Sequence, residues 1–337
     1  MALNPKNTNL MNVLLHLVKY KYKEHQVMLS KEEKKVNSFK IEAIVKNLKY
    51  IGKTKKEIKS SEDLKNVKGF GPGTLSRIDE ILKTGKLKEI NTIKNRYKNI
   101  VKFRKIVDEI IDVIGIGETT AINIVKKHNI VSFDDFKMRV ENNLIEVNDK
   151  IKLGLKYIGK YEKKIKRNII TQIYENIKKT LDKDLIIEVC GSYRRGLSYS
   201  SDIDILICDK NLKTMDQVKE SEKLKSIVKK LKKDGLVTDD LTDKNIKTKY
   251  MGFIRFNNKN YRIDIRLVSD DSFYTALVYF TGSHYFNVSM RNKAKKLFYR
   301  LNEYNLLDVT GRPVAISSEK ELFDKLKMKY LEPYERD

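Results

Sequence analysis

The stretch GSYRRGLSYSSDIDILIC, residues 191–208, places two acids at the start of a run that otherwise has the composition of a buried β-strand. Asp202 and Asp204 are two residues apart, so on a strand their side chains share one face. Like charges held that close repel each other, and each carboxylate is costly to dehydrate alone. Any fold that accommodates this stretch must therefore bring positive charge to the start of the strand.

A third acid lies in a similar setting later in the chain. In YRIDIRLV, residues 261–268, Asp264 shares a strand face with Arg262 and Arg266. If the two strands are neighbours, three carboxylates converge, and such an all-oxygen site suits Mg²⁺, which accepts substrate phosphates as further ligands. A lone Asp-x-Asp could equally begin a strand at the solvent edge, but the third acid favours a cation site.

The residues before the acid pair favour a phosphate ligand. Gly191-Ser192 and Arg194-Arg195-Gly196 offer backbone N–H groups, a hydroxyl and guanidinium groups at the end of a strand, where we expect a turn. We therefore expect two Mg²⁺ ions, with Mn²⁺ as a substitute, to neutralise the acids and a triphosphate to complete their coordination. Two such ions can activate an attacking hydroxyl and stabilise a leaving pyrophosphate.

Two glycine-containing segments resemble each other. VKGFGPGTLSRIDEIL, residues 67–82, and VIGIGETTAINIVKKH, residues 113–128, each place an apolar-Gly-apolar-Gly turn before an amphipathic helix. The glycines allow positive φ and leave backbone N–H groups bare at a helix N-terminus, where a phosphate can bind. One such turn could be an ordinary helix corner. A pair in a basic chain predicts helix-hairpin-helix motifs, which hold a DNA backbone without reading its sequence, through Gly69, Gly71, Gly115 and Gly117.

The net charge points to the same kind of partner. The chain has 70 Lys and Arg against 45 Asp and Glu, a net charge of +25, and residues 1–100 alone hold 23 basic and 10 acidic side chains. This excess favours a polyanion, nucleic acid before an anionic membrane. A lysine-rich solvated surface would give the same charge, so the charge alone does not decide the function.

The pattern of apolar residues predicts an α+β, multidomain chain. Residues 10–90 have the periodicity of short helices, and from about residue 185 the β-rich runs LIIEVC, DIDILIC, KYMGFIRF and YRIDIRLV predict a sheet with helices at 161–181 and 214–233. Residues 272–337 add helices, a strand at LNEYNL and a Gly-Arg-Pro turn. We expect four parts: a helical domain (1–95), a helical DNA-binding subdomain (96–158), a palm-like part with a mixed sheet (159–270) and a C-terminal α/β subdomain (271–337).

Cellular location follows from what the sequence lacks. It has no apolar run long enough to cross a bilayer, and MALNPKNTNL lacks the apolar core of a secretory signal. Cys190 and Cys208 lie among strand-forming residues, which favours buried thiols over a disulfide. We expect a soluble intracellular protein with no membrane partner, in the nucleus or at a viral replication site. The lysine-rich, Trp-free composition is compatible with an AT-rich, viral genome.

These motifs together resemble a known family. GSYRRGLSYSSDIDIL closely resembles the nucleotidyltransferase signature of family X DNA polymerases, beta-like. YFTGSHYFN (279–287), LNEY (301–304), GLKYIGKYEKKI (154–165) and RIDIRL (262–267) match the same family in the same order. The resemblance runs from about residue 10 to Pro333, and other nucleotidyltransferases share only the Gly-Ser and acid pieces.

The resemblance implies that residues 1–95 bind the gap end and the 5′-phosphate, that residues 159–270 form the catalytic palm and that residues 271–337 form the nucleotide-selection subdomain. It also implies roles at matching positions. Asp202 and Asp204 would bind both metal ions, and Asp264 would bind the catalytic ion and take the proton of the primer 3′-hydroxyl. The incoming nucleotide would be held by Ser192, Arg195, Ser201, Asp202, Tyr279, Phe280, Gly282, His284 and Asn287. DNA would be contacted through Lys35, Arg262 and Arg291, with Glu303 and Tyr304 steadying the closing subdomain. Monovalent cations (Na⁺ or K⁺) would bridge to DNA phosphate from the backbone carbonyls of Lys65, Val67, Phe70, Ile111, Val113 and Ile116.

Departures from the family pattern put one activity in doubt. The lysine that forms a Schiff base with 5′-deoxyribose phosphate is replaced by Arg77, whose guanidinium stays protonated and cannot act as that nucleophile. Gly73 and Phe39 replace a second lysine and a tyrosine, whereas Lys35 and Lys65 are kept. We therefore expect 5′-phosphate binding without lyase activity, unless Lys35 or Lys83 substitutes. Ser201, His284 and Val288 also depart from the family, which predicts altered fidelity.

The sequence thus favours a templated, gap-filling DNA polymerase of base excision repair, acting on gapped or nicked duplex DNA and dNTPs. The stretch 234–248 is too short for the loop that untemplated transferases use. We expect a monomer without a further domain before residue 10, and a DNA ligase as a partner. The alternatives are a different nucleotidyltransferase, which YFTGS and the hairpin pair disfavour, and a non-catalytic DNA-end-binding protein, which would not need all three acids.

Overall fold

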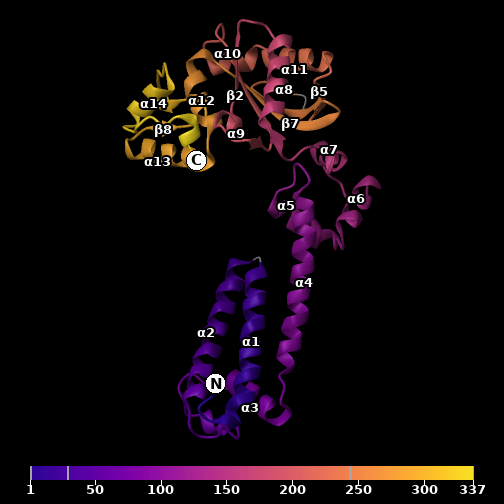
Figure 1. Cartoon of the computed structure of the whole chain (residues 1–337), viewed down its shortest axis with the longest axis vertical. Coiled ribbons are helices and arrows are strands. Elements are labelled where there is room, and N and C mark those ends of the chain that lie inside the picture. Colours follow the sequence, from indigo (N-terminus) through magenta and orange to yellow (C-terminus); the bar gives the residue numbers. More distant parts are fainter. Residues whose placement is uncertain (1, 29, 243–244, 337) are drawn as a thin grey trace. The chain divides into compact units, whose positions relative to one another are not determined.

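The computed structural model describes residues 2–28, 30–242 and 245–336, and the chain divides into two compact units, Met1–Val147 and Asn148–Asp337. The described secondary structure of the first unit consists of helices alone, and the second unit combines helices with a mixed sheet (Figure 1). The predicted α+β, multidomain fold class is confirmed. The division into four functional parts stays a prediction. None of the helices in the described ranges has the length and apolar character of a membrane span.

The first unit is built on long helices. Its elements are η1 (Pro5–Asn7), α1 (Thr8–Val27), α2 (Lys31–Lys53), η2 (Ser61–Leu64), α3 (Pro72–Thr84), α4 (Lys88–Ile111), α5 (Glu118–His128) and α6 (Phe133–Glu141). Leu and Ile side chains of α1 to α4 form one buried cluster. The start of α4 packs beside α1, and α5 packs against α4 near its end (Figure 1).

The prediction of short helices in residues 10–90 was wrong in length, because α1 has 20 residues and α2 has 23. The polar stretch KYKYKEH in α1 has the composition of an exposed segment, yet Lys21 and Glu24 are buried. Both are neutralised by ion pairs with side chains of α4, Glu89 and Arg96. The pairing offsets part of the desolvation cost of each charge, which would be far higher for an unpaired charge, so the helix can continue through them.

The second unit carries the sheet. Its elements are α7 (Asp149–Tyr157), β1 (Ile165–Lys166), α8 (Arg167–Thr180), β2 (Leu185–Val189), α9 (Gly191–Arg194), β3 (Tyr199–Ser200), β4 (Ile203–Asp209), α10 (Met215–Glu220), α11 (Lys223–Lys233), β5 (Val237–Asp240), β6 (Lys249–Phe256) and β7 (Lys259–Val268). The main sheet has the order β2-β4-β7-β6-β5, in which only β4 and β7 are parallel among the described strands. Residues 243–244, in the stretch 234–248, lie outside the described residues.

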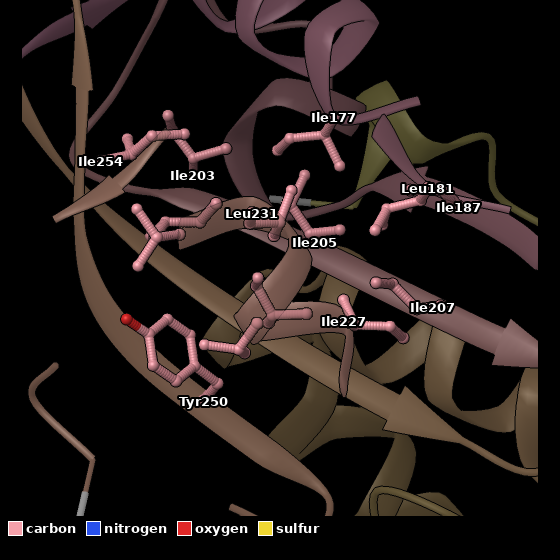
Figure 2. Packing of buried hydrophobic residues seen from close by; sticks show 14 of the residues in the cluster. Ile177, Leu181, Ile187, Ile203, Ile205, Ile207, Ile227, Leu231, Tyr250 and Ile254 are labelled. Carbon is pink, nitrogen blue, oxygen red and sulfur yellow. The ribbon is translucent and has the colours of Figure 1, made fainter. Parts of the chain in front are cut away.

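The two faces of this sheet are covered differently. Ile203, Ile205 and Ile207 of β4 pack with Ile residues of α8 and α11 in one large core, which Figure 2 shows from close by. Leu206 and Cys208, on the opposite face, pack against α12 (Phe273–Thr281). Both cysteines are buried free thiols, as predicted. Alternate residues of β4 therefore face the α8–α11 layer or the α12 layer, and the even-numbered residues face α12.

The C-terminal part adds η3 (Asp270–Ser272), α13 (His284–Lys296), β8 (Arg300–Leu301), β9 (Leu306–Leu307), β10 (Pro313–Val314), α14 (Glu319–Lys325) and η4 (Pro333–Glu335). The strand predicted at LNEYNL is instead two short strands. The side-chain Oδ1 of Asn302 accepts hydrogen bonds from the backbone N–H groups of Tyr304 and Asn305 and so folds the middle of this stretch into a turn.

Helix α7 is fixed to the edge of the sheet. The ring of Tyr157 stacks on Phe253 of β6 at 3.6 Å between centroids, and its hydroxyl donates to Asp239 of β5 at 2.5 Å. Lys156 also donates to Asp239, at 2.9 Å. The motif GLKYIGKYEKKI thus begins by anchoring α7 to strands β5 and β6.

Candidate active site

The three acids lie at one end of the parallel strand pair. Asp204 of β4 is the register partner of Asp264 of β7, and Asp202 directly precedes β4. All three have even numbers, so they belong to the face that α12 covers. The strands that carry the acids are thus neighbours. From the sequence alone, this arrangement had to be assumed in order to bring the three carboxylates together.

The cluster of three acids carries a concentration of negative charge that a bound cation would stabilise. Burial, followed by the charges of Asp202 and Asp264, raises the pKa of Asp204 to about 7. Burial and the charge of Asp202 also raise the pKa of Asp264, although Arg262 opposes this. The buried Oδ1 of Asp264 accepts no hydrogen bond from any residue that the structure describes. Arg262 offers partial compensation: its Nη2 lies 3.3 Å from Asp202 Oδ2 and 3.8 Å from Asp264 Oδ1.

The donor set fits Mg²⁺, which prefers carboxylate oxygens. An unpartnered carboxylate oxygen and a carboxyl with a raised pKa are both stabilised by a nearby cation. Within the described residues, no group of three or more His, Cys, Asp and Glu side chains is already arranged around a common point for a metal ion. Arg262 lies between two of the acids, so its guanidinium would share this space with a bound ion.

A glycine is required directly beside these acids. Gly191, the first residue of α9, has φ +57°, and a Cβ added to it would lie 2.2 Å from Asp204 Oδ2. The backbone N–H of Cys190 donates to the carbonyl of Asp204 at 2.8 Å. The predicted turn at Gly-Ser-Tyr-Arg is thus a one-turn helix, α9, whose start is in contact with the second acid. The hydroxyl of Ser192 donates to that of Ser200 at 2.8 Å.

Predicted triphosphate and sugar residues meet at the end of α12. Arg195 Nη1 donates to the carbonyl of Thr281 at 2.7 Å, and a Cβ on Gly282 would lie 3.2 Å from the same Nη1. The peptide bond between Gly282 and Ser283 is cis, and Ser283 accepts from the backbone N–H of Phe286 at the start of α13. Arg195 and the YFTGS motif thus line adjacent parts of one surface.

Several residues predicted to contact the nucleotide or the DNA are in contact with one another on α12 and α13. Asn287 Nδ2 donates to the carbonyl of Tyr279 at 2.7 Å. The guanidinium of Arg291 lies 5.0 Å from the centre of the Tyr279 ring, and its Nη2 lies 4.0 Å from Glu303. The rings of Tyr279 and Phe280 meet edge to face. Ser201 is exposed, and the ring of His284 contacts the ring of Tyr285 edge to face.

Comparison with known proteins places these features in one family. A family model described as DNA polymerase beta palm matches residues 163–270, one described as DNA polymerase beta thumb matches residues 276–337, and one described as a helix-hairpin-helix domain matches residues 7–87. The chain belongs to the family X DNA polymerases. The segment expected to select nucleotides is thus the one that the family model describes as the thumb.

Several family X relatives match most of the chain. DNA polymerase lambda of Arabidopsis thaliana is 28% identical over 87% of this chain and 57% of that protein, and DNA polymerase lambda of Rattus norvegicus is 26% identical over 84% and 50%. The chain spans about half the length of these curated relatives. A crystal structure of Leishmania infantum polymerase beta, a ternary P/T complex, has a TM-score of 0.62 and 28% identity, covering 70% of this chain and 99% of that one.

One ion cluster of this family X chain was not found from the sequence. Glu319 of α14 accepts two hydrogen bonds from Arg194, both at 2.9 Å, and one from Arg336 at 3.0 Å. Arg194 also donates to Thr281 Oγ1 at 2.8 Å, and the carbonyl of Arg336 accepts from Ser283 N at 2.7 Å. The cluster therefore joins α9, the turn after α12 and the last residues of the described chain. The motif Arg194-Arg195-Gly196 suggested a phosphate contact, but nothing in the sequence indicated that Arg194 pairs with Glu319.

The first unit contains both predicted hairpins in the same conformation. Gly69 has φ +99° and Gly115 has φ +98°, and Gly71 and Gly117 are the N-cap residues of α3 and α5. In each hairpin a backbone N–H donates to the carbonyl three residues earlier, from Phe70 to Val67 at 3.2 Å and from Ile116 to Val113 at 3.1 Å. The repeat seen in the sequence is thus a structural repeat. The cation roles of the carbonyls at 65, 67, 70, 111, 113 and 116 stay predictions.

The lyase position is engaged in a half-buried ion cluster. Arg77 of α3 donates to Glu89 of α4 through Nε at 2.5 Å and through Nη2 at 3.3 Å. Lys21 Nζ lies 3.0 Å from the same carboxylate, and its side chain is only 4% exposed. Lys35 and Lys83 are exposed, and Lys65 pairs with Glu62 at 3.3 Å. The one buried lysine of this cluster is therefore held as a charged partner of Glu89.

Proposed function

We propose that this family X member is a template-directed DNA polymerase that fills short gaps during base excision repair, adding dNMP to a primer 3′-hydroxyl and releasing pyrophosphate. The observation that carries the proposal is the pairing of Asp204 with Asp264 across parallel strands, beside Asp202 and helix α9. Three carboxylates in a partly buried cluster cost stability unless a bound cation and nucleotide occupy the site.

The chain's own residues divide the reaction between them. Asp202, Asp204 and Asp264 would hold two Mg²⁺ ions, which, when bound, lower the barrier by stabilising the charge on the attacking and leaving oxygens. Asp264, whose pKa is raised by burial, can accept the proton of the primer 3′-hydroxyl. Ser192 and Arg195 would hold the triphosphate, and the backbone at Tyr279 to Gly282 would line the sugar. The two hairpins would hold the DNA backbone of a gapped duplex.

Primer extension on DNA with a one-nucleotide gap tests this proposal. In the presence of Mg²⁺ we expect templated addition of one nucleotide, and we expect Asp264→Ala to reduce the rate by at least about 10³-fold, because it removes both a cation ligand and the proton acceptor. Asp216→Ala, which removes an exposed acid on α10, is the matched control and should keep the wild-type rate. An intact protein that binds gapped DNA but adds no nucleotide would point to an end-binding protein instead.

We further propose that the first unit binds the 5′ side of the gap without lyase chemistry. An arginine guanidinium does not supply a free amine, and Arg77 and the buried Lys21 are both paired with Glu89, so neither is available to attack an aldehyde. Borohydride treatment of the protein with a pre-incised abasic site should give no covalent adduct.

The lyase test has an informative pair of variants. An adduct that disappears in Lys35→Ala or Lys83→Ala would contradict the proposal and identify the substitute nucleophile. Arg77→Lys alone should trap poorly, because the carboxylate of Glu89 keeps a neighbouring lysine protonated. Combining Arg77→Lys with Glu89→Gln should trap more, since the lysine then loses its anionic partner.

A further inference from the structure

Helix α4 connects the two hairpins without a break. It follows α3 of the first hairpin after three residues and ends directly before the second hairpin at Val113. Its 24 residues correspond to a length of about 36 Å. A surface along α4 would therefore lie between two segments that we propose to hold DNA phosphates.

One side of α4 is used by the protein itself. In its first half, Ile90 and Ile93 are buried in the core with α1, and the buried carboxylate of Glu24 binds Arg96. In its second half, Ile106, Val107 and Ile110 are buried. The same side also faces a cavity of about 580 Å³, lined in part by Asn99 and Phe103. The side of α4 that faces away from these contacts is therefore the one available to a binding partner.

A row of cations, Lys94, Lys98 and Lys102, begins with the half-buried Lys94 at the edge of the contact with α1 and continues along that opposite side. We call this row the lysine stripe. Residues four apart lie above one another on a helix, so these like charges repel and weaken α4. In the described chain none of the three forms an ion pair, and the Nζ of Lys94 instead lies 4.9 Å from the centre of the Tyr20 ring. Lys98 and Lys102 are exposed. A row that repels itself in the free protein is stabilised when an anion binds along it.

We propose that the lysine stripe binds backbone phosphates of the DNA between the two hairpins. This inference rests on the proposed function, because it assumes that the hairpins hold DNA. The stripe covers about 12 Å of helix, and a DNA strand places a phosphate about every 3.4 Å along its axis, so three phosphates can be matched by three lysines. An acidic protein would also complement the positive charge of the lysine stripe, but the hairpins at both ends of α4 favour a continuous polyanion such as DNA.

The salt dependence of binding tests the proposal. Affinity for gapped DNA is measured by fluorescence anisotropy between 50 and 200 mM NaCl for the wild type and for Lys94→Gln/Lys98→Gln/Lys102→Gln. Each phosphate contact contributes about 0.9 to the slope of log K against log salt, so the variant should have a slope about 2.7 smaller in magnitude. Across this range the wild type should then lose about 40-fold more affinity than the variant does.

The control has the same spacing and the same charge change. Lys225→Gln/Lys229→Gln/Lys233→Gln removes three exposed lysines four residues apart on α11, which packs on the face of the sheet opposite the acids. Its slope should equal that of the wild type. An equal reduction in both variants would overturn the proposal, because net charge would then explain the effect.

A second measurement separates lost contacts from lost folding. Removing the repulsion along α4 should leave the melting temperature of the stripe variant equal to or above that of the wild type, although DNA binding is weaker. A stripe variant with the wild-type slope would overturn the inference and leave the proposed function standing. A wild-type protein whose DNA binding does not depend on salt would instead overturn the assignment of the hairpins, and with it both proposals.

Discussion

Replacing Asp204 by asparagine is expected to stabilise the metal-free protein while abolishing primer extension. The carboxyl lies beside Asp202 and Asp264, and burial together with these charges raises its pKa to about 7. A pKa difference of about three from an ordinary Asp corresponds to at most about 4 kcal/mol, and we expect the free energy of unfolding at pH 8 to rise by about 1–3 kcal/mol. Extension should fall by at least about 10³-fold, because a cation ligand is lost.

The pH dependence has a definite sign. A folded-state pKa raised above the unfolded value of 3.8 favours the protonated form in the native state. The destabilisation is therefore absent below about pH 4, grows between pH 4 and pH 7, and is complete above pH 7. Urea unfolding in EDTA should show the variant and the wild type converging at low pH and separating as the pH rises.

Added Mg²⁺ supplies the control for this prediction. An ion that binds only the folded protein raises its stability by mass action, so Mg²⁺ should raise the melting temperature of the wild type and have little effect on the variant. A variant that is less stable than the wild type at pH 8 in EDTA would show that the carboxylate is compensated within the protein, and the argument for a cation site would lose its electrostatic basis.

The sequence predicted that the acids of each strand lie on one strand face, because the signals for this placement are local. The alternation in DIDIL and RIDIRL places the acids on one strand face, and strands β4, β6 and β7 contain the β-rich runs that predict them. The hairpins were also predictable, since φ near +99° at Gly69 and +98° at Gly115 restricts these positions to glycine in practice. The parallel pairing of β4 with β7 was not predictable, because register depends on contacts across the whole sheet.

What the sequence could not reveal is which charges are buried in pairs. Lys21 and Glu24 have the composition of a helix surface, yet their partners on α4 lie 68 and 72 positions further along the chain. Glu319 and its partner Arg194 are 125 residues apart. A periodicity pattern compares only residues that are close in the sequence, so it cannot detect such pairs. For this reason the long helices were predicted as short ones, and the ion cluster at the C-terminus was missed.

Replacing Glu319 by glutamine is expected to cause the largest loss of stability. Its carboxylate is bound by Arg194 through two hydrogen bonds and by Arg336, whose side chain is 0% exposed. Removing one anion leaves the buried Arg336 and the partly buried Arg194 without this counter-charge, which costs about 3–5 kcal/mol. Asp324→Asn, an exposed acid on the same helix, is the matched control and should change the free energy of unfolding by less than about 0.5 kcal/mol.

The same change should weaken nucleotide binding, because the cluster connects α9 to Thr281 and Ser283 beside the YFTGS motif. Burial raises the pKa of Glu319, but the hydrogen bonds from Arg194 and Arg336 outweigh it and hold the pKa below the usual 4.5. The stabilisation is therefore complete above about pH 4.5 and is lost as the pH falls through the lower folded-state pKa. Unfolding measured at pH 7 and at pH 4 should show the difference between wild type and Glu319→Gln shrinking at the lower pH. A difference that stays constant would mean that packing, rather than the ion cluster, accounts for the loss.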